Sequence, residues 1–458
     1  MITPNADQII KRFHEELPAR RGEVCDYLAR ACDALGARGI ELPFQNERFP
    51  LTPAILPSSW IAVLENGCRA VFEGIELLFH QAFAGDVQRL AAFLKLTEEE
   101  QRLYDIANTA YDWAAVARPD MMVWGDRLAL VETNITTAIG LLADGDMLRQ
   151  ITSEMPVFDD IARGYNLRSI DPIKQLCRLI RATVPDTERK LLALVEWEHE
   201  IPKWRYYYEY LAQELTHHGI PSALVSIESL RVTDNGVYDG TRRVDVIYRF
   251  FTTVHLRQPE LFQRYEPLFA AIRHGKALLL GNFAHKLFTP KMFLALLSDE
   301  VYVRSMPERV RQDLMAIVPW TRLVEERHTL YKGGIIDLVP YATAHKDDFV
   351  LKPNLGFGGL RVTIGCDVTQ SEWEAGLEEA LRSEEHWLLQ ELIPTNPVNL
   401  AFCINGAIEF APVFVDYGVF MLDRCFAGVA RRNSTPATCG RLTNLSQGGG
   451  LGFAFFLP

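Results

Sequence analysis

The sequence predicts a mixed fold of the α/β (α+β) class, and three observations lead to this prediction. Apolar residues recur at helical spacing through most of residues 1–115. Short apolar runs alternate with helical stretches in residues 220–300, which is typical of α/β layers. Residues 346–458 contain strand candidates separated by glycine-rich loops. We therefore expect helices and sheets within one chain, and its 458 residues are too many for a single ordinary core.

The first region, residues 1–115, is expected to be helical. Ile9, Phe13 and Leu17 lie at helical spacing. Thr97, followed by three glutamates, is a capping-box start for a later helix.

The next region, residues 116–150, is expected to contain a β-hairpin. Two apolar runs flank Gly125 and Asp126, which are turn residues. Since this turn is midway between Asp120 and Glu132, the two carboxylates should face each other across the hairpin.

The polar side chains of this hairpin suit a hard cation. Asn134 comes two residues after Glu132 and so points to the same face of the strand. Together with Asp120, these residues offer the oxygen ligands that Mg²⁺ takes beside a nucleotide phosphate. Arg118 shares the face of Asp120 and could hold a phosphoryl oxygen or a carboxylate. The alternative is a polar hairpin with ordinary surface charges.

Basic residues follow in the middle of the chain, where residues 144–200 are expected to be helical before strands and helices alternate. Arg249 follows a strand candidate, and ligand groups commonly lie at the ends of α/β strands. Lys286 and Lys291 flank the entry to a predicted helix. One of them could reach nucleotide phosphates, and a solvated lysine at a helix start is the alternative.

A glycine-rich turn follows the strand that ends in Lys352-Pro353. Gly356, Gly358 and Gly359 would let backbone N–H groups approach phosphate oxygens, and the Lys352 ammonium would pair with them. The spacing is neither that of a P-loop nor that of a Rossmann fingerprint.

Two further segments complete the candidate site. Gln390, Glu391 and Leu392 end a strand in the manner of a hinge that pairs with adenine, although as an isolated string they read as a simple strand end. Arg431 precedes a glycine-rich loop that contains Gly449 and Gly450, which we interpret as a mobile lid.

Composition excludes several classes of protein. The formal charge of −12 argues against a nucleic-acid partner, which needs a basic surface. The eight cysteines form no CxxC pair, so neither a zinc site nor a disulfide scaffold is expected. The N-terminus does not resemble a signal peptide and no apolar stretch approaches a membrane span, so the cytoplasm is the expected location and no membrane partner is expected.

Taken together, the Lys-Pro with its glycine loop, the Gln-Glu hinge, the Arg-x-Asp and the Glu-x-Asn resemble an ATP-grasp ligase. In ordinary ATP-grasp enzymes, such as D-alanine–D-alanine ligase, the last two elements come last. Here Arg118 to Asn134 precede Lys352. That order resembles the circularly permuted branch, which includes eukaryotic-type glutathione synthetase and relatives of glutathionylspermidine synthetase. The resemblance covers most of the chain after about residue 115.

This resemblance implies a permuted ATP-grasp fold with a helical N-terminal region, a central α/β substrate-binding region and a C-terminal β-rich lid. It also implies ATP and Mg²⁺ as cofactors, and a homodimer. The expected regions are a helical region at 1–115, the metal-binding hairpin at 116–150, the helical and α/β substrate-binding region at 151–345, and the nucleotide-binding and lid region at 346–458.

The resemblance also implies a role for each candidate residue. It assigns metal binding to Asp120, Glu132 and Asn134; ATP binding to Lys286, Lys291, Lys352, Gly356, Gly358, Gly359, Gln390, Glu391 and Leu392; catalysis to Arg118, Arg249 and Arg431; and substrate contacts to Thr137, Arg249, Arg431, Gly449 and Gly450.

The expected activity is therefore ATP-dependent ligation of a small amino-acid-like carboxylate to an amine, through an acyl phosphate, with release of ADP and phosphate. The alternatives are a small-molecule phosphotransferase on the same fold and a non-catalytic nucleotide-binding protein. One departure from the family is that Gly356 stands where the family has a metal-binding glutamate. We therefore assign the third metal ligand to Asp120, and we expect substrates other than γ-glutamylcysteine and glycine.

Overall fold

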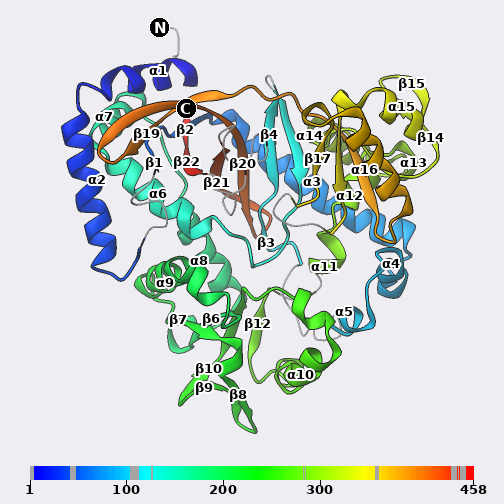
Figure 1. Ribbon diagram of the computed structural model, residues 1–458. Helices are drawn as coiled ribbons and strands as arrows, with labels where there is room; N and C mark the ends of the chain where they lie inside the picture. The colour runs from blue at the N-terminus through cyan, green and yellow to red at the C-terminus, as the bar shows by residue number, and fades with distance from the viewer. Residues whose placement is uncertain are drawn as a thin grey trace.

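The computed structural model describes residues 5–41, 48–103, 113–124, 127–281, 283, 285–355, 360–434, 441, 443 and 450–458. Helices and sheets occur together throughout, which confirms the mixed α/β class. Three units can be followed in Figure 1: a large sheet with helices at the centre and left, a smaller unit below it, and a third unit on the right.

The large sheet has nine strands and is built around the long strand β20. The main path runs β1-β19-β20-β21-β22-β2, and β3 and β4 also pair with β20, while β5 pairs with β4. The strands are β1 (Phe49–Pro50), β2 (Ala54–Pro57), β3 (Val116–Ala117), β4 (Asp120–Trp124), β5 (Arg127–Glu132), β19 (Val398–Ile404), β20 (Ala407–Leu422), β21 (Cys425–Ser434) and β22 (Gly450–Leu457).

Both faces of this sheet are buried by helices. Successive residues of β22 face opposite sides, since Phe453 and Phe455 belong to one core and Ala454 and Phe456 to the other. The first core is covered by α1 (Ala6–Glu16), α2 (Arg21–Gly36), α6 (Leu142–Glu154), α7 (Pro156–Tyr165) and α8 (Pro172–Thr183), and the second by α3 (Ser59–Ala82), α12 (Met292–Ser298) and α14 (Glu308–Ile317).

The smaller unit contains a parallel sheet in the order β12-β11-β6-β7. Its central strand β6 lies within residues 144–200, which we expected to be helical, so that prediction was wrong here. Every residue of β6 is buried, and a short apolar run without alternation does not distinguish a buried strand from a helix. The elements are β6 (Leu192–Glu196), α9 (Ile201–His217), β7 (Ser222–Ser226), β8 (Leu230–Thr233), β9 (Gly236–Asp239), β10 (Arg242–Val244), β11 (Val246–Arg249), α10 (Pro259–Arg273) and β12 (Leu278–Leu280).

The third unit contains an antiparallel sheet in the order β13-β18-β16-β17. It comprises β13 (Thr321–Leu323), β14 (His328–Tyr331), β15 (Gly334–Asp337), α15 (Leu338–Ala344), β16 (Phe349–Pro353), β17 (Thr363–Ile364), α16 (Gln370–Arg382) and β18 (Trp387–Glu391). Short helices α4 (Val87–Phe93), α5 (Glu98–Arg102), α11 (His285–Phe288) and α13 (Glu300–Val303) complete the α-helices within the described residues.

Two local predictions are confirmed. Thr97 and Glu100 form the capping box at the start of α5. β4 and β5 form an antiparallel pair with Asp120 opposite Glu132. The turn residues Gly125 and Asp126 lie outside the described residues.

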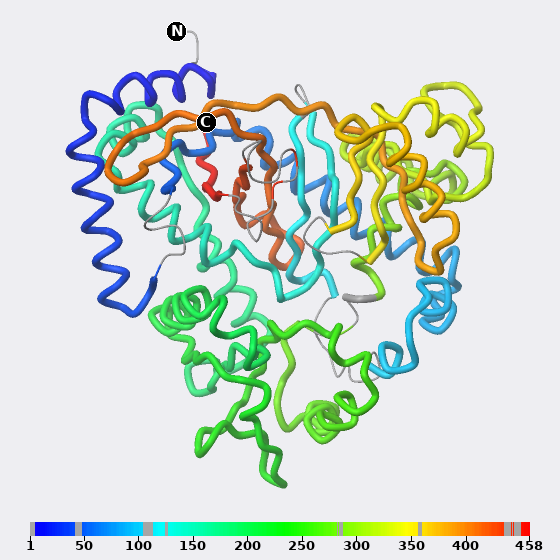
Figure 2. The backbone as a smooth tube through the Cα atoms, in the orientation of Figure 1, coloured from blue at the N-terminus to red at the C-terminus, as the bar shows by residue number. Residues whose placement is uncertain are grey.

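The hairpin of β4 and β5 occupies a central place in the molecule. The tube in Figure 2 shows these cyan strands between the C-terminal strands of the large sheet and the yellow third unit. β4 pairs with β20 on one side and β5 on the other. The residues of the hairpin can therefore meet side chains from all three units. None of the helices in the described ranges combines the length and hydropathy of a membrane span.

Candidate functional site

A cavity of about 540 Å³ lies where the three units meet. Its lining comes from β4, β5, the start of α6, the end of β6, α9, and the strands β16, β18, β20 and β21. Of the predicted residues, it brings together Arg118, Asp120, Glu132, Asn134, Lys291, Lys352, Gln390, Glu391 and Leu392.

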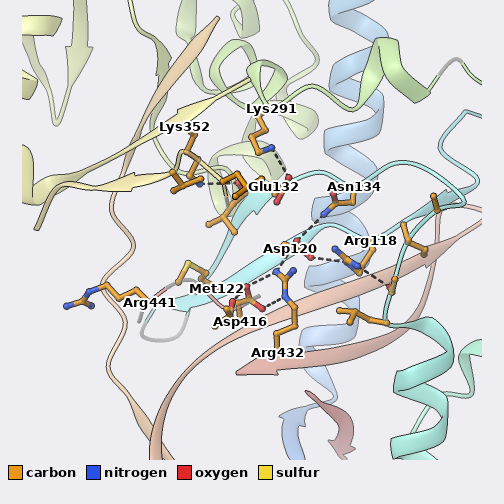
Figure 3. A pocket seen from close by; sticks show the side chains of 18 of the residues that line it. Arg118, Asp120, Met122, Glu132, Asn134, Lys291, Lys352, Asp416, Arg432 and Arg441 are labelled. Atoms are coloured by element: carbon orange, nitrogen blue, oxygen red, sulfur yellow. Dashed lines mark hydrogen bonds and ion pairs between the residues drawn. The ribbon is translucent and has the colours of Figure 1, made fainter. Parts of the chain in front are cut away.

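Strand register places four charged residues in a row on the cavity face. Arg432 of β21 lies opposite Asp416 of β20. Two residues further along β20, Gly418 lies opposite Asp120 of β4, and Asp120 lies opposite Glu132 of β5. Figure 3 shows these side chains converging above the strands. We call this end of the cavity the paired-charge floor.

Asp120 lies at the centre of the floor and is 1% exposed. Its Oδ1 accepts a hydrogen bond from Arg118 Nε at 3.1 Å. Its Oδ2 lies 2.9 Å from Arg432 Nη2 and accepts a hydrogen bond from Asn134 Nδ2 at 3.0 Å. Burial acts to raise the pKa of Asp120, but the two guanidinium groups overcome it and hold the pKa below its ordinary value.

Asp416 is the second acid held by Arg432. The pair is bidentate, with Arg432 Nε and Nη2 each donating to one Asp416 oxygen at 2.7 Å. Thr443 also donates its hydroxyl to Asp416. Burial raises the pKa of Asp416, and the Asp120 charge adds to this, although Arg432 opposes it.

Two lysines face the other carboxylate of the floor. Lys291 Nζ lies 2.9 Å from Glu132 Oε1. Lys352 Nζ donates to Gln390 Oε1 at 2.6 Å, and Gln390 in turn donates to Thr321 Oγ1 at 3.0 Å. The pKa of Lys352 is lowered to about 8, chiefly by burial and also by the nearby Lys291, while the Glu132 charge opposes the shift. A phosphate beside Lys352 would favour the charged form of its ammonium group.

The hinge segment uses its backbone N–H groups within the protein. Glu391 N–H donates to Trp320 O at 2.9 Å, and Leu392 N–H donates to Asp348 O at 2.7 Å. The Glu391 carboxylate accepts from the Trp320 backbone N–H at 2.9 Å. A purine in this part of the cavity would therefore not receive hydrogen bonds from these two N–H groups.

The opposite end of the cavity has a different character. Asp144, Glu196 and Glu200 line it, and we call them the acidic wall. Tyr206 OH donates to Asp144 at 2.9 Å, and Tyr208 OH donates to Glu196 at 2.8 Å. The aromatic lining beside them is Trp204, Tyr207, Tyr208 and Phe250.

Two acids of the wall have pKa values shifted in the direction opposite to that of Asp120. Burial raises the pKa of Asp144 to about 6, although the Tyr206 hydroxyl opposes the shift. Burial also raises the pKa of Glu196, with a further contribution from Glu200. None of the described lining residues from α9 or the end of β6 is cationic. The cationic residues of the described lining come from the floor strands, β16 and nearby segments, and they are Arg118, Lys291, Lys352, Arg432 and Arg441.

Arg249 and Thr137 do not line the cavity. Arg249 is 1% exposed and donates to Gly281 O at 2.7 Å, to Phe251 O at 2.8 Å and to Thr136 Oγ1 at 2.8 Å. Thr137 donates its hydroxyl to Arg249 O at 2.6 Å. Gly281 has a φ of +81°, and a Cβ there would lie 1.9 Å from Thr137 Oγ1, so the junction requires glycine. Both residues thus make contacts within the protein away from the cavity lining, and their predicted substrate roles stay predictions.

Arg431 also lies away from the cavity. It donates to Thr52 O at 2.7 Å and to Pro53 O at 3.2 Å. Adjacent residues of a strand point to opposite faces, so Arg432 rather than Arg431 reaches the cavity. Gly450 lies in β22, outside the lining.

The remaining predicted positions lie outside what the structure describes. These are Gly356, Gly358, Gly359 and Gly449, together with the side chain of Lys286, whose backbone belongs to α11.

The side-chain oxygens of Glu132 and Asn134 and the two lysines of the floor fit Mg²⁺ and a nucleotide phosphate. Glu132 contacts Lys291 through Oε1, and Asn134 donates through Nδ2, so Glu132 Oε2 and Asn134 Oδ1 remain as oxygen ligands of the kind Mg²⁺ takes. Lys291 and Lys352 beside them supply the positive charge that polyphosphate requires.

Sequence reasoning missed the acidic wall and the pair of Asp416 and Arg432. The Arg431-Arg432 doublet was a signal for Arg432, but only the strand register decides which of the two faces the cavity.

Comparison with known proteins gives a likeness of fold. No protein-family model matches the chain, and no curated protein matches its sequence. A glutathione synthetase-like effector from Globodera pallida, solved in its apo form, matches 94% of this chain and 96% of its own with 13% identity and a TM-score of 0.53. At this identity the match shows a shared fold. A second solved structure, of a Methylobacillus flagellatus protein named as a candidate γ-glutamylcysteine synthetase, matches 82% of this chain and 84% of its own with 13% identity. Its TM-score of 0.39 is too low to carry an argument.

Proposed function

We propose that this protein is an ATP- and Mg²⁺-dependent ligase that joins a small carboxylate to an amine through an acyl phosphate. One observation carries the proposal: a single cavity joins a floor of cations and oxygen ligands to a wall of acids. The floor suits polyphosphate and the wall suits an ammonium group. The order of the sequence elements, together with the fold shared with the glutathione synthetase-like effector, supports a permuted ATP-grasp assignment.

The reaction requires two displacements. A substrate carboxylate oxygen attacks the γ-phosphorus, and the bond from that phosphorus to the bridging oxygen breaks as ADP leaves. The amine nitrogen then attacks the acyl carbon, the C–O bond to phosphate breaks, and the nitrogen loses a proton.

The floor residues act on the first displacement. Lys352 and Lys291 would neutralise phosphate oxygens, and Glu132 with Asn134 would hold Mg²⁺, which supplies charge neutralisation and alignment when bound. Arg118 donates to Gly140 O at 3.1 Å as well as to Asp120, so its guanidinium is fixed between the floor and the start of α6. It would hold the transferring phosphoryl group.

The acidic wall acts on the second displacement. Glu196 and Glu200 would bind the amine substrate as an ammonium group, and the aromatic rings beside them would cover its apolar portion. The ammonium would pass one proton to a wall carboxylate before its nitrogen attacks, and the nitrogen would lose a second proton after the C–N bond forms. The amine would then enter from the end of the cavity opposite the phosphates.

Glu132→Ala tests the proposal. The enzyme is incubated with Mg·ATP, pooled amino acids and amines, and ADP and phosphate are followed by chromatography. The variant is expected to reduce amine-dependent ADP formation at least about a hundredfold with the fold retained, because the Glu132 side chain is 28% exposed. Glu198→Ala is the matched control, since Glu198 is an exposed acid outside the cavity lining.

Several outcomes would contradict the proposal. AMP and pyrophosphate as products would indicate adenylation. ADP formation that needs no amine and leaves a stable phosphorylated product would indicate a phosphotransferase. Turnover of Glu132→Ala near that of the unmodified protein would refute the metal assignment.

A further inference from the structure

We propose that Asp120 is not a metal ligand, and that Asp120 and Asp416 together fix Arg432 as a permanent cation of the phosphate site. Glu132 and Asn134 are then the protein ligands of the metal. This inference rests on the proposed function, because it concerns the same nucleotide site, and it changes the role that the sequence predicted for Asp120.

The first argument is that Asp120 already contacts two guanidinium groups and an amide. Both of its carboxylate oxygens are already engaged, one by Arg118 and the other by Arg432 and Asn134. The side chain is 1% exposed, so a metal ion could reach it only after these contacts break. Removing a charged partner from a buried carboxylate is strongly unfavourable.

The second argument is the geometry of Arg432. Its Nε and Nη2 form a bidentate pair with Asp416, and Nη2 also reaches Asp120. Two carboxylates on adjacent strands therefore hold one guanidinium, and the register of β20, β21 and β4 fixes all three residues. The Arg432 guanidinium is planar and already held in place, so it loses little conformational freedom when it binds another group.

The third argument is that Arg432 keeps a donor for a ligand. Within the described part of the chain the contacts of Arg432 use Nε and Nη2, which leaves Nη1 to donate to a phosphate oxygen. Arg432 lines the cavity and its side chain is 16% exposed. Figure 3 shows its guanidinium beside that of Arg118, on either side of Asp120.

Gly418 leaves the space that the Arg118 side chain occupies beside Asp120. A Cβ at Gly418 would lie 2.9 Å from Arg118 Cδ, so a side chain there would displace Arg118. The floor thus presents two fixed guanidinium groups around one buried carboxylate. Fixed cations of this kind stabilise transferring phosphate without reorganisation.

The test counts metal ions rather than turnover. Mn²⁺ is titrated into the protein with a non-hydrolysable ATP analogue, AMP-PNP, and free Mn²⁺ is measured by electron paramagnetic resonance. Glu132→Gln is expected to weaken Mn²⁺ binding at least about tenfold, because it loses a charged metal ligand. Asp120→Asn and Asp416→Asn are each expected to leave the Mn²⁺ affinity within about twofold.

A second variant protects the test from a folding defect in Asp120→Asn. Arg432→Met is expected to weaken AMP-PNP binding about tenfold, as loss of one phosphate contact does, with the number of bound Mn²⁺ ions unchanged. Arg432→Lys keeps the charge and should recover part of the affinity. Each variant is compared by its melting curve.

Three outcomes separate this inference from the proposed function. An Asp120→Asn or Asp416→Asn variant that folds but loses Mn²⁺ as Glu132→Gln does would overturn the inference alone. Additional Mn²⁺ bound by Arg432→Met would also overturn it, because the arginine would then have occupied a metal site. Absence of any Mn²⁺-dependent AMP-PNP binding in the unmodified protein would overturn the proposed function, and this inference with it.

Discussion

The paired-charge floor and the acidic wall each contain a buried aspartate, Asp120 and Asp144, and the pKa values of these two groups are shifted in opposite directions. On the floor, Asp120 contacts two arginines, and they hold its pKa below the ordinary value against the effect of burial. On the wall, Asp144 is held by a tyrosine hydroxyl and backbone groups, and burial raises its pKa to about 6. A buried carboxylate held by two guanidinium groups, such as Asp120, attracts a further cation weakly, whereas one held by neutral donors attracts it more strongly.

Because of this difference, the two parts of the cavity favour ligand groups of opposite charge. Anionic groups of a ligand gain most at the floor, where Lys291, Lys352 and Arg432 lie, and cationic groups gain most at the wall. Charge of both signs in one cavity suits two substrates that meet in the middle, next to Arg118.

The largest effect is expected from removal of a floor cation. Lys352→Met should weaken Mg·AMP-PNP binding about a thousandfold, since loss of one partner of a buried charge pair costs about 4 kcal/mol. Isothermal titration calorimetry measures the affinity. Lys346→Met is the matched control, because Lys346 contacts Asp347 and Gly365 outside the cavity lining. If both variants lost the same Mg·AMP-PNP affinity, the floor lysine would bind the nucleotide no better than a lysine elsewhere on the surface, which would contradict the comparison.

The next effect concerns the wall and depends on pH. The pKa of Asp144 rises from 3.8 to about 6 on folding, so between about pH 4 and pH 6 the folded protein keeps a proton that the unfolded chain has lost. The free energy of unfolding should therefore fall as pH rises through this window, by about 3 kcal/mol for a shift of about two units.

Asp144→Asn isolates that contribution. The variant cannot ionise at this position, and its stability relative to the unmodified protein should increase from pH 4 to pH 6.5 in urea titrations. Tyr206 can still donate to the asparagine oxygen. A relative stability that decreases over this range would mean that Asp144 is paired with a cation, as the floor acids are.

The smallest effect is expected from an exposed member of the wall. Once phosphate release has identified an amine substrate, Glu200→Gln should raise its KM about threefold with little change in kcat, as expected for a partly exposed ion pair. Glu198→Gln should leave KM unchanged, because Glu198 lies outside the cavity lining. A change in kcat alone would place Glu200 in the chemical step rather than in amine binding.

Some parts of the molecule were predictable because they depend on local chemistry. The capping box at Thr97 and the pairing of Asp120 with Glu132 follow from residues close in sequence, and both are present. The strand β6 was not predictable, because a buried apolar run has no period that separates strand from helix. The faces of Arg431 and Arg432 were not predictable either, since a shift of one residue in register exchanges them.

The sequence by itself determined the mixed fold class and the set of charged residues on the hairpin and on the strands around it. It did so because hydrophobic period and turn chemistry act over short stretches of chain. The tertiary structure alone decided which of those charges meet. It buried Arg249 among carbonyl groups, turned Arg431 away, and set Arg432 between two carboxylates. The physical reason is that the role of a charged side chain depends on its partners, and those partners come from strands far apart in the sequence.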